Sequence, residues 1–303
     1  MIEPFVAPPF LSVTIGFIVF FVGAFLTRKV GFLRAFSIPE PVSGGLFIAL
    51  MIWLWREVAG REIEFDLAVR DYLLVIFFAC IGLNARVADL IVGGKRLAIL
   101  LGLTVIFMLM QNVVGAAGAL AFGMPLEVGV LLGTASLIGG HGTAIAWGPT
   151  IEAQSGFAAA AEIGVAAATL GLIVAALLGG PIAKYLIERK SLTAANGDGD
   201  VVGLPFEGER AKSEDVNHVN LMRSMLAAHV AVILGYVANE AIEEAGLKLP
   251  LFVPCLLAGI VMSNTIPLAL PSLPWPARSR SLALLSDYCL SVFLAMSLMS
   301  LQL

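Results

Sequence analysis

The chain contains eight long runs of apolar residues, and these runs limit the folds open to it more than any other feature. A helix needs about 20 largely apolar residues to cross the hydrocarbon core of a membrane. Only 13% of the residues are charged and 59% are hydrophobic, whereas a soluble domain carries about 25% charged residues. A globule of this length has too little interior for so much apolar surface. We therefore predict an all-α integral membrane protein surrounded by a lipid bilayer.

The predicted spans follow one another along the whole sequence and are separated by more polar segments. They are Pro9–Thr27, Pro41–Trp55, Tyr72–Leu83 with a polar extension to Leu90, Leu97–Phe122, Phe157–Ile187, Leu221–Ala241, Leu251–Asn264 and Leu282–Leu303. With the N-terminus outside, fourteen of the 18 Lys and Arg residues fall in cytoplasmic segments, as the positive-inside rule requires. Residues 190–220 are rich in Gly, Asp, Glu and Lys, which predicts a cytoplasmic linker between two halves.

A weak internal repeat indicates how the two halves are related. Asp71–Ala79 matches Asp287–Ala295 at an offset of 216 residues. Upstream, Ile38-Pro39 resembles Leu249-Pro250 at an offset of 211 residues. One copy of the longer match starts outside and the other inside, which is typical of secondary transporters built from inverted repeats.

The repeat predicts a domain organisation. We expect a first repeat over 1–189, with five spans and a re-entrant loop at about 125–152, and a partial second repeat of three spans over 221–303. The offset places the counterpart of the re-entrant loop near position 357. We therefore expect a truncated chain whose second repeat is incomplete.

Glycines interrupt the apolar segment 125–152 at its centre, in the sequence Gly139-Gly-His-Gly-Thr-Ala144. Irregular backbone cannot face lipid because its N–H and C=O groups would lack partners. We predict two half-helices that meet at the glycines and form a re-entrant hairpin. A half-helix beginning near Thr143 presents N–H groups to a carboxylate, and one ending near Ile138 presents carbonyls to Na+. The hydroxyls of Ser136 and Thr143 are further candidate ligands.

Polar side chains in or beside the apolar spans complete the set of candidates. His141 can donate to a carboxylate or gate by protonation, or it can be a hydrogen-bonded structural residue. Asn84 stands where the third span loses its apolar character, and Gln111 and Asn112 lie in the middle of the fourth. We consider all three as ion ligands, while Gln111 and Asn112 can equally bond across helices. For the glycines, close packing of helices is the alternative.

Other functional classes fit the sequence less well than a carrier. An intramembrane enzyme is disfavoured because no HExxH or GxSxG motif and no intramembrane aspartate pair occurs. Channel filters usually come from symmetric subunits, and no basic stripe with interleaved aromatics indicates a nucleic-acid partner. A cation-coupled carrier is the leading hypothesis, and a resemblance in four motifs implies that its solute is an acidic amino acid. A symporter for another organic anion, such as a dicarboxylate, and a non-transporting fragment stay open.

Four motifs resemble, in order, the bacterial sodium/glutamate symporter family. They are IPEPVSGG (Ile38–Gly45), FACIGLNA (Phe78–Ala85), GGHGT (Gly139–Thr143) and LAMSLMS (Leu294–Ser300). The resemblance implies Na+-driven uptake of glutamate across the inner membrane. It also implies two inverted repeats and a homodimer with a moving core domain. The charge pattern predicts a periplasmic N-terminus. By the same resemblance, substrate binding is expected at Gly139, Gly140, His141, Gly142 and Thr143.

Overall fold

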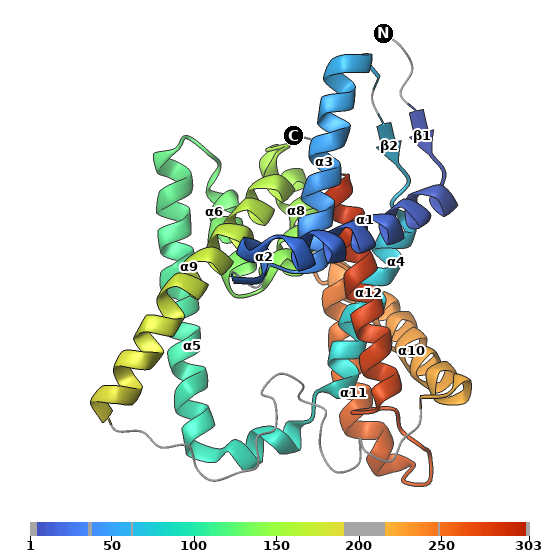
Figure 1. Cartoon of the computed structure of the whole chain (residues 1–303). Coiled ribbons are helices and arrows are strands. Elements are labelled where there is room, and N and C mark those ends of the chain that lie inside the picture. Colours follow the sequence, from blue (N-terminus) through green and yellow to red (C-terminus); the bar gives the residue numbers. More distant parts are fainter. Residues whose placement is uncertain (1–4, 36–37, 62, 191–215, 248, 301–303) are drawn as a thin grey trace.

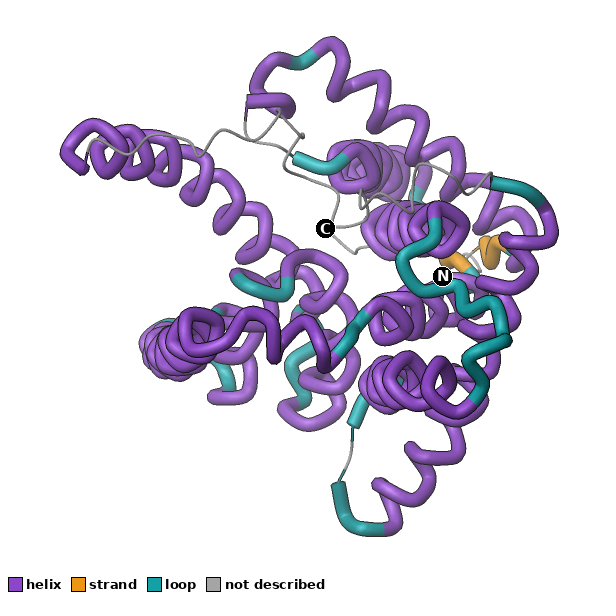
Figure 2. The backbone as a smooth tube through the Cα atoms, turned by 90° about the horizontal axis from the view of Figure 1, so that it is seen from below, coloured by secondary structure: helices purple, strands orange, loops and turns teal. Residues whose placement is uncertain are grey.

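The protein is almost entirely helical in the computed structural model, which describes residues 5–35, 38–61, 63–190, 216–247 and 249–300 (Figure 1). The helices are α1 (Pro9–Lys29), α2 (Gly31–Ala35), α3 (Glu40–Ala59), α4 (Ala68–Asn84), α5 (Val87–Ala121), α6 (Gly129–Leu132), α7 (Thr134–Leu137), α8 (Gly140–Ser155), α9 (Ala160–Lys190), α10 (His218–Glu244), α11 (Phe252–Ala269) and α12 (Arg280–Met299). A 3-10 turn, η1 (Leu126–Val128), precedes α6. Figure 2 shows how little of the described chain is strand.

Six of the described helices are long and apolar enough to cross a membrane, namely α1, α3, α5, α10, α11 and α12. The α4 helix is also apolar but has only 17 residues. The α9 helix contains a shorter apolar segment, Ala160–Gly171. The fold class is therefore that of an all-α, multi-pass integral membrane protein, as the sequence predicts.

The described helices correct one predicted boundary. The third span does not extend to Leu90, because α4 ends at Asn84 and Ala85 is extended, with φ −81° and ψ 122°. A new helix, α5, begins at Val87. The interruption follows from two side chains that bind the backbone at this corner, Asn84 itself and Asn264. The predicted linker at 190–220 lies mostly outside the described residues.

Helix ends follow local rules that can be read in the sequence. Pro39 stands just before α3 and Pro41 lies in its first turn, where a missing N–H costs nothing. The side chains of Asn217 and Ser279 accept hydrogen bonds from the backbone of the first turns of α10 and α12. Gly60 ends α3 in the left-handed conformation that a side chain disfavours.

Two groups of helices each have their own apolar core. The first, which we call the bundle, consists of α1, α3, α4, α10, α11 and α12, and its fully buried side chains include Ile76, Leu83 and Phe293. The second, which we call the hairpin group, consists of α5 to α9 and η1, with Val128, Leu131 and other residues at its centre. The two groups lie at the right and left of Figure 1.

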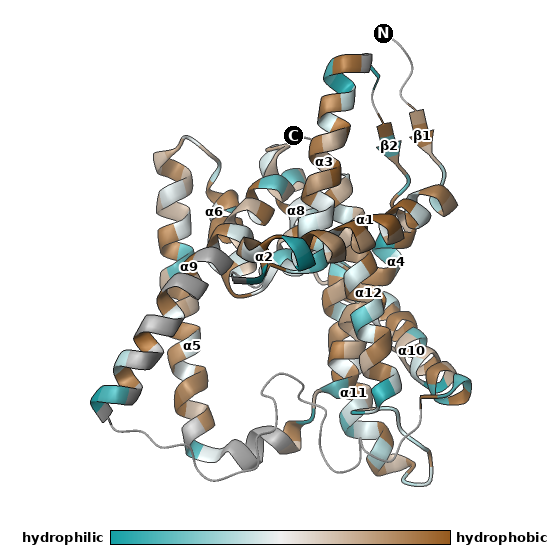
Figure 3. Ribbon diagram, viewed as in Figure 1, coloured by the Kyte–Doolittle hydropathy of each residue, from teal (hydrophilic) through white to brown (hydrophobic). Residues whose placement is uncertain are grey.

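The outward faces of the long helices are apolar. No residue of α5 from 97 to 114, its most apolar part, is buried. Figure 3 shows hydrophobic residues along α1 and α5 on faces that no other helix covers. Large exposed side chains such as Phe107 and Leu109 are stable there only against lipid or another protein.

A small parallel sheet, which the sequence did not predict, connects the start of the chain to the start of α4. Strand β1 (Phe5–Ala7) pairs with β2 (Ile63–Phe65), so that Phe5 lies opposite Ile63. The Ser12 hydroxyl donates to the Ala7 carbonyl at 3.2 Å and so joins β1 to α1.

Candidate functional site: a broken helical hairpin

The hairpin segment, residues 126–155, breaks at two glycines in its centre. The α7 helix ends at Leu137, and Gly140 has a φ of +73°, which favours glycine. A Cβ at Gly139 would lie 2.5 Å from the carbonyl oxygen of Ala135, so this position also excludes a side chain. The prediction of two half-helices that meet at the glycines agrees with these positions.

The second half-helix starts earlier than predicted. It begins at Gly140 rather than near Thr143, because the left-handed turn falls on Gly140 and leaves Gly142 free to be helical. The Thr143 hydroxyl donates to the Gly139 carbonyl at 2.9 Å, across the first turn. The N–H groups of the first turn of α8 have no carbonyl one turn earlier within the helix, so they can bind an anion.

A further break at Gly133 was not predicted, and Asn112 of α5 accounts for it. The Asn112 side-chain oxygen accepts hydrogen bonds from the backbone N–H of Thr134 at 3.0 Å and from its hydroxyl at 2.9 Å. A Cβ at Gly133 would lie 2.5 Å from the same oxygen. Asn112 thus bonds across helices and caps α7, which was the structural alternative for this residue.

His141 lies buried in the first turn of α8, with 6% of its surface exposed. Its Nε2 atom is 3.0 Å from the Thr169 hydroxyl of α9. That hydroxyl donates to the Val165 carbonyl at 2.9 Å, so the imidazole N–H is the donor to Thr169. His141 therefore fastens the hairpin tip to α9.

Buried oxygen atoms without a hydrogen-bond partner among the described residues include those of two predicted ion ligands. They are the hydroxyl of Ser136, in α7, and the side-chain oxygen of Gln111, in α5. Ser136 is 2% exposed, and a Cβ at Gly164 of α9 would lie 3.6 Å from its hydroxyl oxygen. Unpaired buried oxygens are costly, and hard cations prefer oxygen ligands. Both residues therefore keep the ion-ligand role predicted for them as a hypothesis.

The structure separates Asn84 from the other candidates. Its side-chain oxygen accepts from the backbone N–H of Arg278 at 2.9 Å, at the end of α4. Sequence reasoning missed the residue beside it, Asn264, which accepts from the Val87 N–H at 2.8 Å and donates to the Ala85 carbonyl at 3.0 Å. No local signal could have found Asn264, because its partners lie 177 and 179 positions away.

The tip of the hairpin faces the bundle. A Cβ at Gly142 would make ordinary contact, at 3.7 Å, with Leu290 and Phe293 of α12. Gly139, Gly140, His141, Gly142 and Thr143 thus lie together at the junction between the hairpin group and the bundle, with Ser136 at the end of the preceding half-helix. Broken helices at such a junction are typical of multi-pass membrane proteins of the secondary-transporter class.

The comparison with known proteins names the group within that class. A family model described as sodium/glutamate symporter matches residues 10–303. The chain belongs to the sodium/glutamate symporter family.

Individual relatives agree with this assignment. The chain is 35% identical to the sodium/glutamate symporter of Escherichia coli (strain K12) over 282 residues, which make up 93% of this chain and 69% of that protein. It is 32% identical to the sodium/glutamate symporter of Haemophilus influenzae over 294 residues, or 96% of this chain and 72% of that protein. No solved structure matches the chain.

Proposed function

We propose that this chain is a Na+-coupled symporter that takes up glutamate across the bacterial inner membrane and binds it at the tip of the hairpin. The observation that carries the proposal is the break at Gly139 and Gly140, which exposes the start of α8 inside the protein. Membership of the family supplies the solute and the coupling ion, since the relatives are named for both.

The two helix ends at the break have the polarity to bind glutamate and Na+, respectively. The positive end of the α8 dipole and its first N–H groups, from Gly140 to Thr143, would hold a carboxylate of glutamate. The carbonyls at the end of α7 and the unpartnered hydroxyl of Ser136 are oxygen ligands of the kind that Na+ takes. In this arrangement His141 positions the tip through Thr169, and the Gln111 oxygen is a second candidate ligand for the ion.

The proposal includes an inverted repeat that relates α1, α3 and α4 to α10, α11 and α12. Three helix contacts recur in both halves at the offsets found in the sequence. Gly23 approaches Gly44 as Gly235 approaches Cys255, Gly45 approaches Leu298 as Leu256 approaches Gly82, and the Phe17–Tyr288 ring pair corresponds to His229–Tyr72. These matched contacts support repeats over 1–189 and 221–303. The periplasmic N-terminus, the re-entrant path of the hairpin and the homodimer stay predictions.

Uptake of labelled glutamate by proteoliposomes tests the function. We expect accumulation that depends on an inward Na+ gradient and is lost when choline replaces Na+. Gly140→Ala and His141→Ala should remove uptake while the protein still inserts into the membrane. Gly102→Ala is the matched control, because Gly102 lies on α5 with no atom near its Cβ position.

Each contrary outcome has a distinct meaning. Uptake that is unaffected by the loss of Na+ would contradict the coupling. Stronger competition by dicarboxylates than by unlabelled glutamate would favour the organic-anion alternative. If transport survives both hairpin substitutions, the glycines serve packing and the site lies elsewhere.

A further inference from the structure

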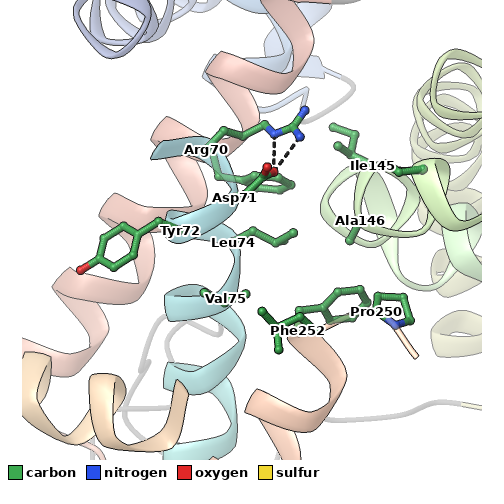
Figure 4. A pocket seen from close by; sticks show the side chains of 12 residues that line it. Arg70, Asp71, Tyr72, Leu74, Val75, Ile145, Ala146, Pro250 and Phe252 are labelled. Carbon is green, nitrogen blue, oxygen red and sulfur yellow. Dashed lines mark hydrogen bonds and ion pairs between the residues drawn. The ribbon is translucent and has the colours of Figure 1, made fainter. Parts of the chain in front are cut away.

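A cavity of about 430 Å³ lies where the hairpin group meets the bundle (Figure 4). Its walls come from the start of α4, from α8 and from the start of α11. Ile145 and Ala146, on α8, face Leu74 and Val75 of α4 across the cavity. Because Ile145 follows Thr143, the last residue of the proposed substrate site, by two positions, the cavity adjoins that site.

The cavity is apolar apart from one end. Phe252 forms part of its floor and packs against Phe78, with ring centroids 4.3 Å apart, and against Trp147, at 6.3 Å. Tyr72 also lines the wall, but its hydroxyl is held by Nε2 of His229 at 2.6 Å. The remaining polar side chains of the lining are the adjacent residues Arg70 and Asp71.

Arg70 is held by a weak partner. Its Nε and Nη2 atoms both donate to the same carboxylate oxygen of Asp71, at 2.9 and 2.6 Å. The Arg70 side chain is only 19% exposed, whereas that of Asp71 is 60% exposed. An ion pair with so exposed an acid contributes about 1 kcal/mol or less. A mostly buried Arg70 side chain thus lines the cavity, and the Nε–Nη2 edge of its guanidinium is occupied by a solvated neighbour that is easily displaced.

A guanidinium edge of this kind matches a carboxylate, with which it forms two parallel hydrogen bonds. The apolar walls suit a short methylene chain. We infer that Arg70 is a specificity-determining residue for transport, whose guanidinium binds the side-chain carboxylate of the incoming amino acid after that carboxylate displaces Asp71. This inference rests on the proposed function, because it assigns a second contact for the same solute. Asp71 then acts as a competing carboxylate that neutralises Arg70 when no substrate is bound.

Steady-state uptake by three variants tests the assignment. Arg70→Gln should raise the KM for glutamate about 10-fold or more, because a charge-assisted pair is lost, with little change in kcat. Arg70→Lys keeps the charge but lacks the planar guanidinium, so its KM should lie between those of the wild type and Arg70→Gln. Asp71→Asn should change KM in the opposite direction, lowering it about two- to fivefold, because the competing carboxylate is gone.

The opposite changes in KM distinguish a substrate-binding role of Arg70 from a purely structural one. If the Arg70–Asp71 pair served only the fold, both substitutions would lower the yield of folded protein and leave KM alone. An unchanged KM in Arg70→Gln, or a raised KM in Asp71→Asn, would overturn the inference while wild-type uptake upheld the proposed function. Glutamine is the matched control solute because it lacks the side-chain carboxylate. The affinity for glutamine, measured by its competition with labelled glutamate, should therefore be insensitive to Arg70→Gln.

Binding of glutamate can also be measured without transport, through its effect on the melting temperature. We expect glutamate to raise the melting temperature of the purified wild-type chain, and the size of this shift to fall in Arg70→Lys and to grow in Asp71→Asn. This readout needs no transport, so absent uptake would count against the proposed function alone. Equal shifts in the wild type and in both variants, or no shift in any of them, would overturn the inference about Arg70.

Discussion

Glycine serves the bundle and the hairpin in different ways. Where α1 and α3 cross, a Cβ at Gly23 would lie 1.8 Å from the Glu40 carbonyl oxygen, and one at Gly44 would lie 2.0 Å from that of Val19. At the hairpin tip, a Cβ at Gly140 would meet no atom within 4 Å, but the φ of Gly140 is +73°. The bundle uses the missing side chain to bring helices together, whereas Gly140 uses the missing steric restriction on the backbone. A count of glycines cannot distinguish these two uses.

The largest effect on stability should follow from Gly44→Ala in the bundle. The added methyl group would overlap backbone atoms of α1, which cannot move aside as a side chain would. Overpacking costs about 1–3 kcal/mol and sometimes more, and we expect the upper end. The melting temperature in detergent and the yield of folded protein measure this. An alanine variant as stable as the wild type would show that α1 and α3 can separate without loss.

Asn112→Ala should have the next largest effect, and it falls on the hairpin group. The substitution removes the acceptor shared by the Thr134 N–H and hydroxyl, at the Gly133 break. Loss of a partner costs a buried polar group about 1–3 kcal/mol, and we expect the lower end because the Thr134 groups are partly buried. Val113→Ala, at the exposed neighbouring position of α5, is the matched control. Should Asn112→Ala melt at the wild-type temperature, water or a rearranged α7 must satisfy Thr134.

Gly140→Ala should destabilise the protein less, yet reduce transport more. A left-handed backbone costs a non-glycine residue about 1–2 kcal/mol, and no clash adds to that cost. Because the strain falls on the proposed site, uptake should drop while folded protein is still obtained. Measuring uptake per folded molecule separates the two effects, and a fall in uptake only in proportion to yield would remove the distinction between tip and bundle.

The smallest effect, with the opposite sign, should come from Gly102→Ala. Gly102 lies within α5, has no atom near its Cβ position and faces outward. Alanine in a helix interior is favoured over glycine by about 0.5–1 kcal/mol, so the melting temperature should rise slightly. A fall would indicate that a neighbour outside this chain packs against α5 at this point.

Local sequence carries the positions of the helices and of the hairpin tip. Apolar runs bounded by residues such as Pro39 and Gly156 mark helices, and the cluster at Gly139 and Gly140 marks a turn, because these effects need only nearby residues. The break at Gly133 depends on the hydrogen bond between Thr134 and Asn112, which lies 22 positions before Thr134. No pattern around Gly133 distinguishes it from the packing glycines, so only the folded chain reveals this break.

The cavity beside the hairpin could not be predicted for the same reason. In the sequence, Arg70 is one of the four basic residues predicted on the outer side of the membrane. Its position against Ile145 and Phe252 results from three helices that meet there. The internal repeat was weak in sequence because only a few side chains match. The repeat proposed above rests on contacts made by glycines, such as Gly23 with Gly44, that form no recognisable sequence pattern.

The corner between α4 and α5 has a consequence for the order of assembly during synthesis. Asn264, in α11, caps the start of α5 at Val87 and follows it by 177 residues. At about 5–20 residues per second, the ribosome needs roughly 9–35 s to cover that distance. Throughout this interval the Val87 N–H at the start of α5 lacks its acceptor, the side-chain oxygen of Asn264. The first half of the protein is thus completed by a residue of the second half, and this corner is secured only once α11 has been inserted.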